Sequence, residues 1–350
     1  MSPQNPTFDP SAPAQGAGIY GLPHTPEEAS VILIPVPWEP TTSYGRGAAL
    51  GPSAILKASA QVDLFDSETG RPYEAGIAML DTDPEIALWN AEACAAAEPI
   101  IASGGDVSGD PDLERRLRLV NDLSAKLDDR VASIARAWLD QGKLVGVIGG
   151  DHAAPFGSIK AHAERWPGLG VLHIDAHADL RLAFEGFQGS HASIMRNVAE
   201  RLPSVSKILQ VGLRDFAEDE HNYIRGSGGR IEALYDSELS ARLFDGEPFT
   251  TIAASLVEGL PRDVYVTFDI DGLDPSLCPH TGTPVPGGLS FRQAIALIAA
   301  VQKSGRRIVG FDLNEVAPGP DGDEWDGNVG ARVLYKLIGF ALRSRKGVLA

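Results

Sequence analysis

The segment 170-GVLHIDAHADLR-181 carries the strongest signals for both the fold and the chemistry of this chain. Its first half is a continuous apolar run, which is typical of a strand buried on both faces of a parallel sheet. Its second half places His173, Asp175, His177 and Asp179 at every second position, where such a strand should end. Because residues two apart project to the same side of an extended chain, we expect Asp175, His177 and Asp179 to converge.

Five further apolar runs, each bounded by turn residues, predict other strands of the same sheet. These runs are 31–36, 144–150, 207–212, 264–271 and 307–313. Stretches with the apolar spacing of a helix lie between or after them, at 51–59, 112–141, 155–166, 251–260, 290–304 and 328–344. The alternation of strand and helix predicts an α/β fold with a mostly parallel sheet between helical layers. Ligands of such a sheet bind beyond the carboxyl ends of its strands.

The composition narrows the classes of protein that this chain can be. A length of 350 residues with 43% hydrophobic residues suffices for one large α/β domain. We interpret residues 1–30, rich in proline and glycine, as an N-terminal extension and residues 31–350 as a single catalytic domain. The formal net charge of −17 argues against a nucleic-acid partner and is compatible with a small cationic substrate.

Neither secretion nor a membrane association is expected. The first thirty residues lack the basic and apolar regions of a signal peptide, and no apolar run reaches the roughly 18 residues that a membrane span needs. Cys94 and Cys278 stand far apart and form neither a disulfide framework nor a CxxC metal motif. These features predict a cytoplasmic enzyme.

Two other predicted strands also end in carboxylates or imidazoles. Asp151 and His152 follow one run, and Asp269, Asp271 and Asp274 close another. Like charges a few ångströms apart in a low-dielectric cleft repel strongly, so this many carboxylates cannot stay ionised together without a cation. The strand ends therefore predict a metal centre.

The donor types indicate which metal this centre would bind. Oxygen ligands with two imidazoles suit Mn²⁺ or a similar divalent ion, and the absence of thiolates argues against a structural zinc site. His152 and His177, with four aspartates, supply enough donors for two ions that share bridging carboxylates. His173 lies inside the apolar run and is expected to be a hydrogen-bonded core or supporting histidine.

Three features beyond the metal cluster stand where a substrate would lie. His191 is delivered by a loop that contains Gly186 and Gly189, which suits a proton-transfer residue at the rim of a site. Glu315 lies just past the last predicted strand, where a carboxylate can pair with a substrate cation. The loop 279–290, rich in proline and glycine, is expected to be stiff. A structural role for Glu315 and a plain connector at 279–290 stay open as alternatives.

Four blocks of the sequence resemble the ureohydrolase superfamily of arginases, agmatinases and formiminoglutamases. They are 149-GGDHA-153, 175-DAHADLR-181, 269-DIDGLDPSLCPHTGTPVPGG-288 and 312-DLNEVAP-318. The resemblance implies a three-layer α/β/α sandwich, assembled as a homotrimer or homohexamer, with two Mn²⁺ ions per chain or Ni²⁺ in their place. One ion would be held by His152, Asp175, Asp179 and Asp269. The other would be held by Asp175, His177, Asp269 and Asp271.

The same resemblance implies a reaction and three catalytic residues. A water activated by the two ions would attack the guanidino carbon of a small cationic substrate and release urea with an amine or ammonia. Glu315 would bind the guanidinium, His191 would contact the substrate and relay protons, and Asp179 would pass a proton to the departing amine.

The substrate-binding positions depart from the pattern of arginases. Animal-type arginases hold the α-carboxylate of arginine with an asparagine and a serine at the positions that are Arg181 and Phe187 here. We therefore expect agmatine or another guanidine without a carboxylate, including free guanidine, ahead of arginine itself. A single-zinc deacetylase of the related fold and a non-catalytic relative are the remaining alternatives.

Overall fold

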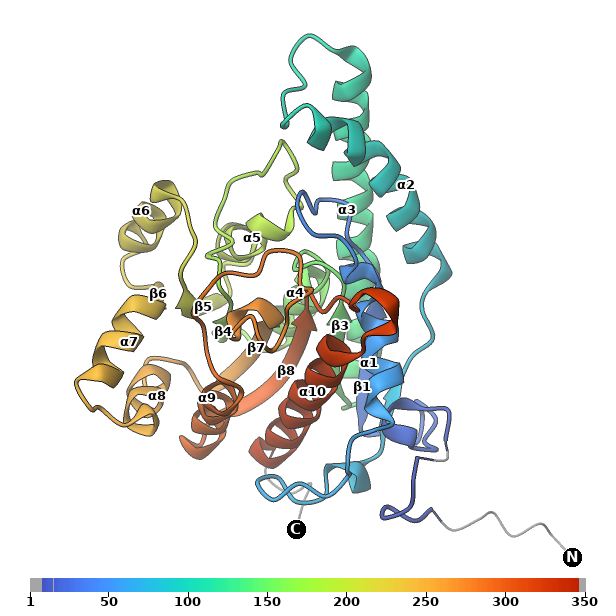
Figure 1. The fold of residues 1–350 in the computed structure, drawn as a ribbon, viewed down its shortest axis with the longest axis vertical. Coiled ribbons are helices and arrows are strands. Elements are labelled where there is room, and N and C mark those ends of the chain that lie inside the picture. Colours follow the sequence, from blue (N-terminus) through green and yellow to red (C-terminus); the bar gives the residue numbers. More distant parts are fainter. Residues whose placement is uncertain (1–7, 15, 346–350) are drawn as a thin grey trace, which may run out of the picture.

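A computed structural model describes residues 8–14 and 16–345 of this chain. Part of the predicted extension, residues 1–7, and the end of the predicted domain, residues 346–350, lie outside the described residues. Within them, one sheet has the strand order β2-β1-β3-β8-β7-β4-β5-β6 (Figure 1), and every neighbouring pair is parallel. The strands are β1 (Val31–Val36), β2 (Ile77–Met79), β3 (Leu144–Gly149), β4 (Leu169–Ile174), β5 (Val205–Leu213), β6 (Ile231–Tyr235), β7 (Asp263–Asp269) and β8 (Arg307–Asn314).

Helices cover both faces of this sheet. One layer packs its apolar side chains into a single core with the sheet and consists of α1 (Gly51–Ser59), α7 (Asp236–Phe244), α8 (Phe249–Val257), α9 (Phe291–Lys303) and α10 (Trp325–Ser344). The other layer consists of α2 (Pro84–Ala102), α3 (Pro111–Leu139), α4 (Phe156–Arg165), α5 (Ile194–Arg201) and α6 (Glu218–Gly226). The predicted α/β/α sandwich is therefore confirmed. Along the described ranges, no helix combines the length and the hydropathy needed to cross a bilayer.

All six apolar runs of the sequence form strands, whereas both edge strands, β2 and β6, were not predicted. β2 has three residues, too few for a recognisable run. β6 is buried at Ile231 but exposed at Glu232, because an edge strand is covered less completely than a central one. A continuous apolar run is a signature of strands covered on both faces, so it identifies the centre of the sheet and not its edges.

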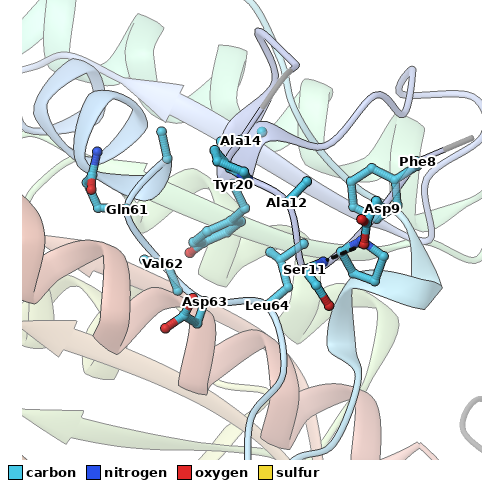
Figure 2. A pocket seen from close by; sticks show the side chains of 14 residues that line it. Phe8, Asp9, Ser11, Ala12, Ala14, Tyr20, Gln61, Val62, Asp63 and Leu64 are labelled. Atoms are coloured by element: carbon cyan, nitrogen blue, oxygen red, sulfur yellow. Dashed lines mark hydrogen bonds between the residues drawn. The ribbon is translucent and has the colours of Figure 1, made fainter. Parts of the chain in front are cut away.

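The N-terminal segment packs onto the domain before the first strand begins. Tyr20 is buried, its hydroxyl donates to the carbonyl of Ala331 in α10 at 3.0 Å, and its amide donates to Oγ of Ser59 at 2.8 Å. Figure 2 shows Tyr20 beside a cavity of about 330 Å³ that residues 8–14 and 60–64 line. The predicted boundary at residue 31 thus marks the first strand and not the first residue packed into the core.

Candidate metal centre

The central four strands of the sheet deliver the predicted site residues to one edge. β3, β8, β7 and β4 are consecutive neighbours in the sheet, and their carboxyl ends meet at the same edge. His152 follows β3, Glu315 follows β8 directly, Asp269 is the last residue of β7, and Asp175 is the first residue after β4. Residues up to 163 positions apart in the chain are thereby brought into hydrogen-bonding contact.

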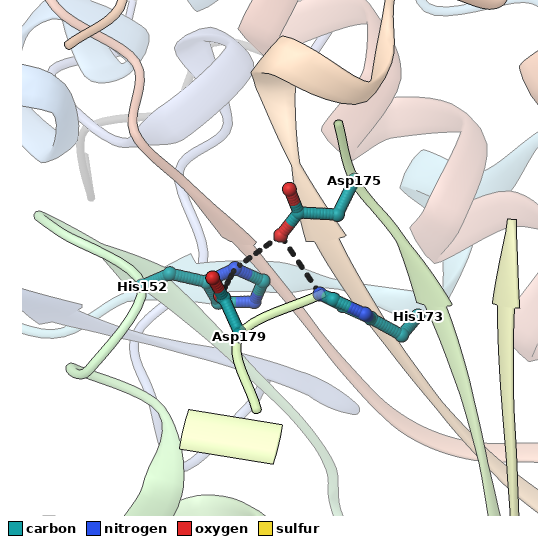
Figure 3. A group of neighbouring side chains, drawn as sticks. All are labelled: His152, His173, Asp175 and Asp179. Atoms are coloured by element: carbon teal, nitrogen blue, oxygen red, sulfur yellow. Dashed lines mark hydrogen bonds and ion pairs between the residues drawn. The ribbon is translucent and has the colours of Figure 1, made fainter. Parts of the chain in front are cut away.

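Four predicted ligands meet around one nitrogen atom. Nδ1 of His152 lies 3.0 Å from Oδ2 of Asp175, 3.3 Å from Oδ2 of Asp179 and 3.3 Å from Oδ2 of Asp269. All four side chains are buried. Figure 3 shows His152, Asp175 and Asp179 pointing toward one another, and these three, with Asp269, form the set predicted to hold the first ion.

A second cluster shares Asp175 with the first. Its other oxygen, Oδ1, lies 3.5 Å from Nδ1 of His177, which is itself 3.0 Å from Oδ2 of Asp271. Asp269 lies beside this cluster because its Oδ1 accepts the amide of Asp271 at 2.8 Å. The carboxylate of Asp175 therefore turns one oxygen toward each imidazole, as a bridging ligand requires.

Turns, and not strand periodicity, produce this convergence. β4 ends at Ile174, so the alternating positions after it are not on an extended strand, and Asp179 has a positive φ of 53°. Asp271 lies in the 3₁₀ turn Ile270–Gly272, beyond the end of β7. The expectation that residues two apart share one strand face was wrong for both segments, although the residues that it selected do meet.

Asp274 takes no part in either cluster. Its Oδ1 accepts the amide of Ser276 at 2.9 Å and the Ser276 hydroxyl at 2.6 Å, so it closes a turn in its own loop. Hydrogen bonds from these two groups lower the pKa of its carboxyl. Asp274 follows Asp269 and Asp271 in the sequence, but its role in the structure is to stabilise a turn of the loop.

The electrostatics of the two clusters fit divalent cations. Burial, together with the charges of Asp271 and Asp175, raises the pKa of Asp269 well above its usual range. Burial and the neighbouring Asp175 likewise raise the pKa of Asp179 to about 6. Carboxylates placed like this are fully ionised only beside a cation, and the donor set of carboxylate oxygens and two imidazole Nδ1 atoms suits a pair of divalent ions. The residues present thus fit the metal site that the sequence predicts.

A hydrogen-bonded chain behind the cluster orients His152. Nε2 of His152 lies 2.8 Å from Oγ1 of Thr267, whose hydroxyl donates to Oδ1 of Asp312 at 2.8 Å. Since the Thr267 hydroxyl donates its hydrogen bond to Asp312, its oxygen accepts one from Nε2–H, and in the neutral imidazole Nδ1 then keeps its lone pair toward the aspartates. Thr267 and Asp312 were not singled out from the sequence, although each is a polar residue inside an otherwise apolar strand.

His173 supports the cluster from the strand itself, as predicted. Its ring is fully buried, Nε2 lies 2.8 Å from Oδ2 of Asp175, and Nδ1 lies 2.9 Å from Nε2 of Gln210. The amide nitrogen of Gln210 can only donate, so Nδ1 accepts and Nε2–H donates to the carboxylate. His173 therefore orients Asp175, the carboxylate that the two clusters share.

Glu315 is held in a strained and buried position next to the cluster. Its φ is +62°, and its amide donates to the carbonyl of Gly150 at 2.7 Å. One carboxylate oxygen, Oε1, accepts the amide of His152 at 2.9 Å, while Thr281 donates to the Glu315 carbonyl at 2.8 Å. A glutamate with positive φ is uncommon, and such strain is concentrated at functional positions. Thr281 belongs to the loop 279–290, which therefore packs against the site.

His191 lies at the start of the short 3₁₀ turn His191–Ser193. Its Nδ1 is 3.0 Å from Oγ1 of Thr41, a residue of the loop after β1, and Thr41 also donates to Asp151 at 3.3 Å. Burial, with the nearby imidazoles of His177 and His152, lowers the pKa of His191 to about 4. The ring is therefore neutral near pH 7 and can accept a proton. The sequence held no signal for Thr41.

A cavity of about 180 Å³ opens beside these residues. His177, Asp179 and His191 line it, together with Arg181 and Glu220. Nε of Arg181 lies 3.7 Å from Oε2 of Glu220, and its guanidinium stacks over the ring of Phe184. Phe187 is fully buried in a cluster with residues of α2 and α3, so it does not face this cavity.

Both the sequence and the fold resemble those of known proteins. The family model described as "Arginase family" matches residues 29–339. The N(1)-aminopropylagmatine ureohydrolase of Thermus thermophilus is 34% identical over 92% of this chain and 94% of its own length, and the agmatinase of Bacillus subtilis is 30% identical over 90% and 93%. The proclavaminate amidino hydrolase structure from Streptomyces clavuligerus superposes with a TM-score of 0.70 at 25% identity and covers 95% of this chain and 99% of that one. The chain therefore belongs to the arginase family, which confirms the resemblance inferred from the four sequence blocks.

Proposed function

We propose that this protein hydrolyses the guanidino group of a small, carboxylate-free cation to urea and an amine, with agmatine or a close derivative as the substrate. As a member of the arginase family it is a metal-dependent hydrolase that acts on C–N bonds of linear amidines. The observation that carries the proposal is the carboxylate of Asp175, whose two oxygens face the Nδ1 atoms of two different histidines. A mononuclear deacetylase would not need this second, connected cluster.

Two divalent ions at this centre would be held by His152, Asp175, Asp179 and Asp269 on one side and by Asp175, His177, Asp269 and Asp271 on the other. When bound, they supply a water that is acidic enough to attack a guanidino carbon near neutral pH. We propose Mn²⁺ as the resident ion, with Ni²⁺ as the alternative.

Side chains that line the cavity, and Glu315 next to the metal cluster, would supply proton transfer and substrate binding. One oxygen of Glu315 is occupied by the His152 amide, and the other, Oε2, borders Gly282 and is available to a guanidinium N–H. Asp179 lies on the wall of the same cavity, and it is the carboxylate that we propose to pass a proton to the departing amine. His191 is neutral and lines the same cavity, so it can accept a proton from the product side.

The cavity supports a carboxylate-free substrate over arginine. Animal-type arginases have a serine at the position of Phe187. In this chain Phe187 is buried in the core and offers no hydroxyl to a ligand. Arg181 is partly neutralised by Glu220 and covered on one face by Phe184. The relatives named as N(1)-aminopropylagmatine ureohydrolase and agmatinase point to the same class.

A urea-release screen tests this proposal. The full-length protein, loaded separately with Mn²⁺ and with Ni²⁺, is assayed with agmatine, N(1)-aminopropylagmatine, guanidinobutyrate, free guanidine and arginine. We expect the highest kcat/KM with agmatine or its aminopropyl derivative. A preference for arginine would favour the arginase alternative, and urea formation from none of them would contradict the proposal. The proposal also includes a cytoplasmic location and assembly as a homotrimer or homohexamer. Light scattering would measure the number of chains in the assembly.

A further inference from the structure

A third cavity lies at the opposite edge of the sheet from the candidate metal centre. It has a volume of about 300 Å³ and is bordered by the residues that precede or begin β7 and β8 and by the end of α10. Its lining includes the side chains of Arg262, Arg307 and Arg345, with Trp166 and Ser344. Three arginines around one cavity are unexpected in a chain whose formal net charge is −17.

The charges of these arginines are only partly compensated within the described residues. Arg307 pairs with Asp263 at 2.6 Å. For Arg262 and Arg345, no carboxylate of the described ranges lies within the 4.0 Å of an ion pair. Burial, together with the charges of Arg307 and Arg165, lowers the pKa of Arg345, so these guanidiniums are close enough to repel one another. The cavity therefore carries a net positive charge.

The chemistry of the lining points to an oxyanion. Guanidinium groups present planar arrays of N–H donors that match phosphate and carboxylate oxygens, and their mutual repulsion is relieved when an anion binds between them. The hydroxyl of Ser344 donates to a carbonyl within its own helix and its oxygen accepts the amide of Ile308, so the arginines are the donors left for a ligand. Trp166 adds an apolar wall, with the guanidinium of Arg165 at 5.7 Å from its ring.

We propose that this cavity is a binding site for a small phosphate-bearing anion, separate from the metal centre. Arg262 and Arg345 bind the phosphate oxygens, and Arg307 contributes positive charge while it remains paired with Asp263. The site is independent of the proposed reaction because Arg262 and Arg307 stand at the amino ends of β7 and β8, whereas Asp269 and Glu315 stand at the carboxyl ends of the same strands.

Isothermal titration of the full-length, metal-loaded protein with inorganic phosphate tests this site. We expect the unmodified protein to bind phosphate saturably, with an affinity that falls as salt is added. In the double variant Arg262→Gln/Arg345→Gln the affinity should be at least tenfold lower. The matched control, Arg118→Gln/Arg225→Gln, makes the same change of charge on the helices α3 and α6 and should bind phosphate like the unmodified protein. Sulfate, a second tetrahedral dianion, should compete.

Three results would overturn the proposal. One is phosphate binding of equal strength in both double variants, which would place the anion elsewhere, for example at the metals. Another is no saturable binding by the unmodified protein. The third is dissociation of an oligomer by phosphate, measured by light scattering, since it would mean that carboxylates of a second copy occupy the cavity. If the double variant does not fold, Arg262→Gln alone, at an exposed residue, should still weaken binding.

Discussion

Nε2 of His152 lies 2.8 Å from the hydroxyl oxygen of Thr267, and this hydroxyl donates a hydrogen bond to Asp312. This contact selects the tautomer of the imidazole whose Nδ1 faces three aspartates. The strand that ends in Asp269 thereby also orients His152, the imidazole that follows β3.

Replacing Thr267 with valine should weaken metal binding without removing any ligand. The variant keeps the shape of the side chain but leaves a buried N–H of His152 without an acceptor, and loss of such outer contacts typically lowers metal affinity by about 10–100-fold. Competition with a fluorescent chelator measures this affinity directly. Thr267→Ser restores the hydroxyl and should restore affinity; equal affinity in all three proteins would contradict the assigned tautomer.

Substitutions of Asp175 and Asp271 should remove different numbers of bound metal ions from the protein. Asp175 faces both imidazoles, so Asp175→Asn should leave close to no bound metal, whereas Asp271→Asn should leave about one ion per chain. Elemental analysis after gel filtration counts the ions. Asp274→Asn serves as the control because Asp274 closes a turn outside both clusters, and it should retain the full metal content. Full content in Asp175→Asn would refute a bridged centre.

Glu315→Gln should abolish most of the activity and leave the metals in place. The substitution removes the buried negative charge proposed to pair with the guanidinium, and loss of one partner of such a pair typically costs about 2–5 kcal/mol. We expect kcat/KM for urea release to fall by about 100-fold or more, with metal content unchanged. Glu238→Gln, on the exposed part of α7, is the control. Unchanged kcat/KM would assign Glu315 a purely structural role.

His162 should make the fold sensitive to acid. Its ring is fully buried between Trp166 and Tyr265, and burial lowers its pKa to about 4, below the usual 6.5. His162 therefore binds a proton at a higher pH in the unfolded chain than in the folded one. The neutral imidazole stabilises the fold above pH 6.5, and this contribution is lost as the pH falls toward 4. By pH 5 the loss amounts to about 2 kcal/mol.

Urea denaturation at pH 7 and pH 5 measures this loss. In His162→Gln, which does not titrate, the difference in the free energy of unfolding between the two pH values should be smaller by that amount. His24→Gln is the control, because His24 does not pack with Trp166 and Tyr265 as His162 does. This variant should keep the pH difference in the free energy of unfolding that the unmodified protein shows. An equal pH dependence in His162→Gln and the unmodified chain would contradict the assignment.

The sequence by itself determined the central strands, and it selected the six residues that we propose as metal ligands, because both leave strong local signals. A strand covered on two faces must be apolar throughout, and a cluster of carboxylates and imidazoles directly after it has few structural explanations. The edge strands β2 and β6 leave no such signal, since they are short or only half covered.

Only the tertiary structure decided which contacts orient those six residues. Thr41, Thr267 and Asp312 reach the site from three different strands or loops, and an isolated threonine or aspartate has the same local sequence signature wherever it lies. Turns after β4 and β7, and not strand alternation, bring Asp179 and Asp271 to the centre. The physical reason is that hydrogen bonds between distant segments depend on how the sheet orders its strands, which the chain specifies only through the packing of the whole domain.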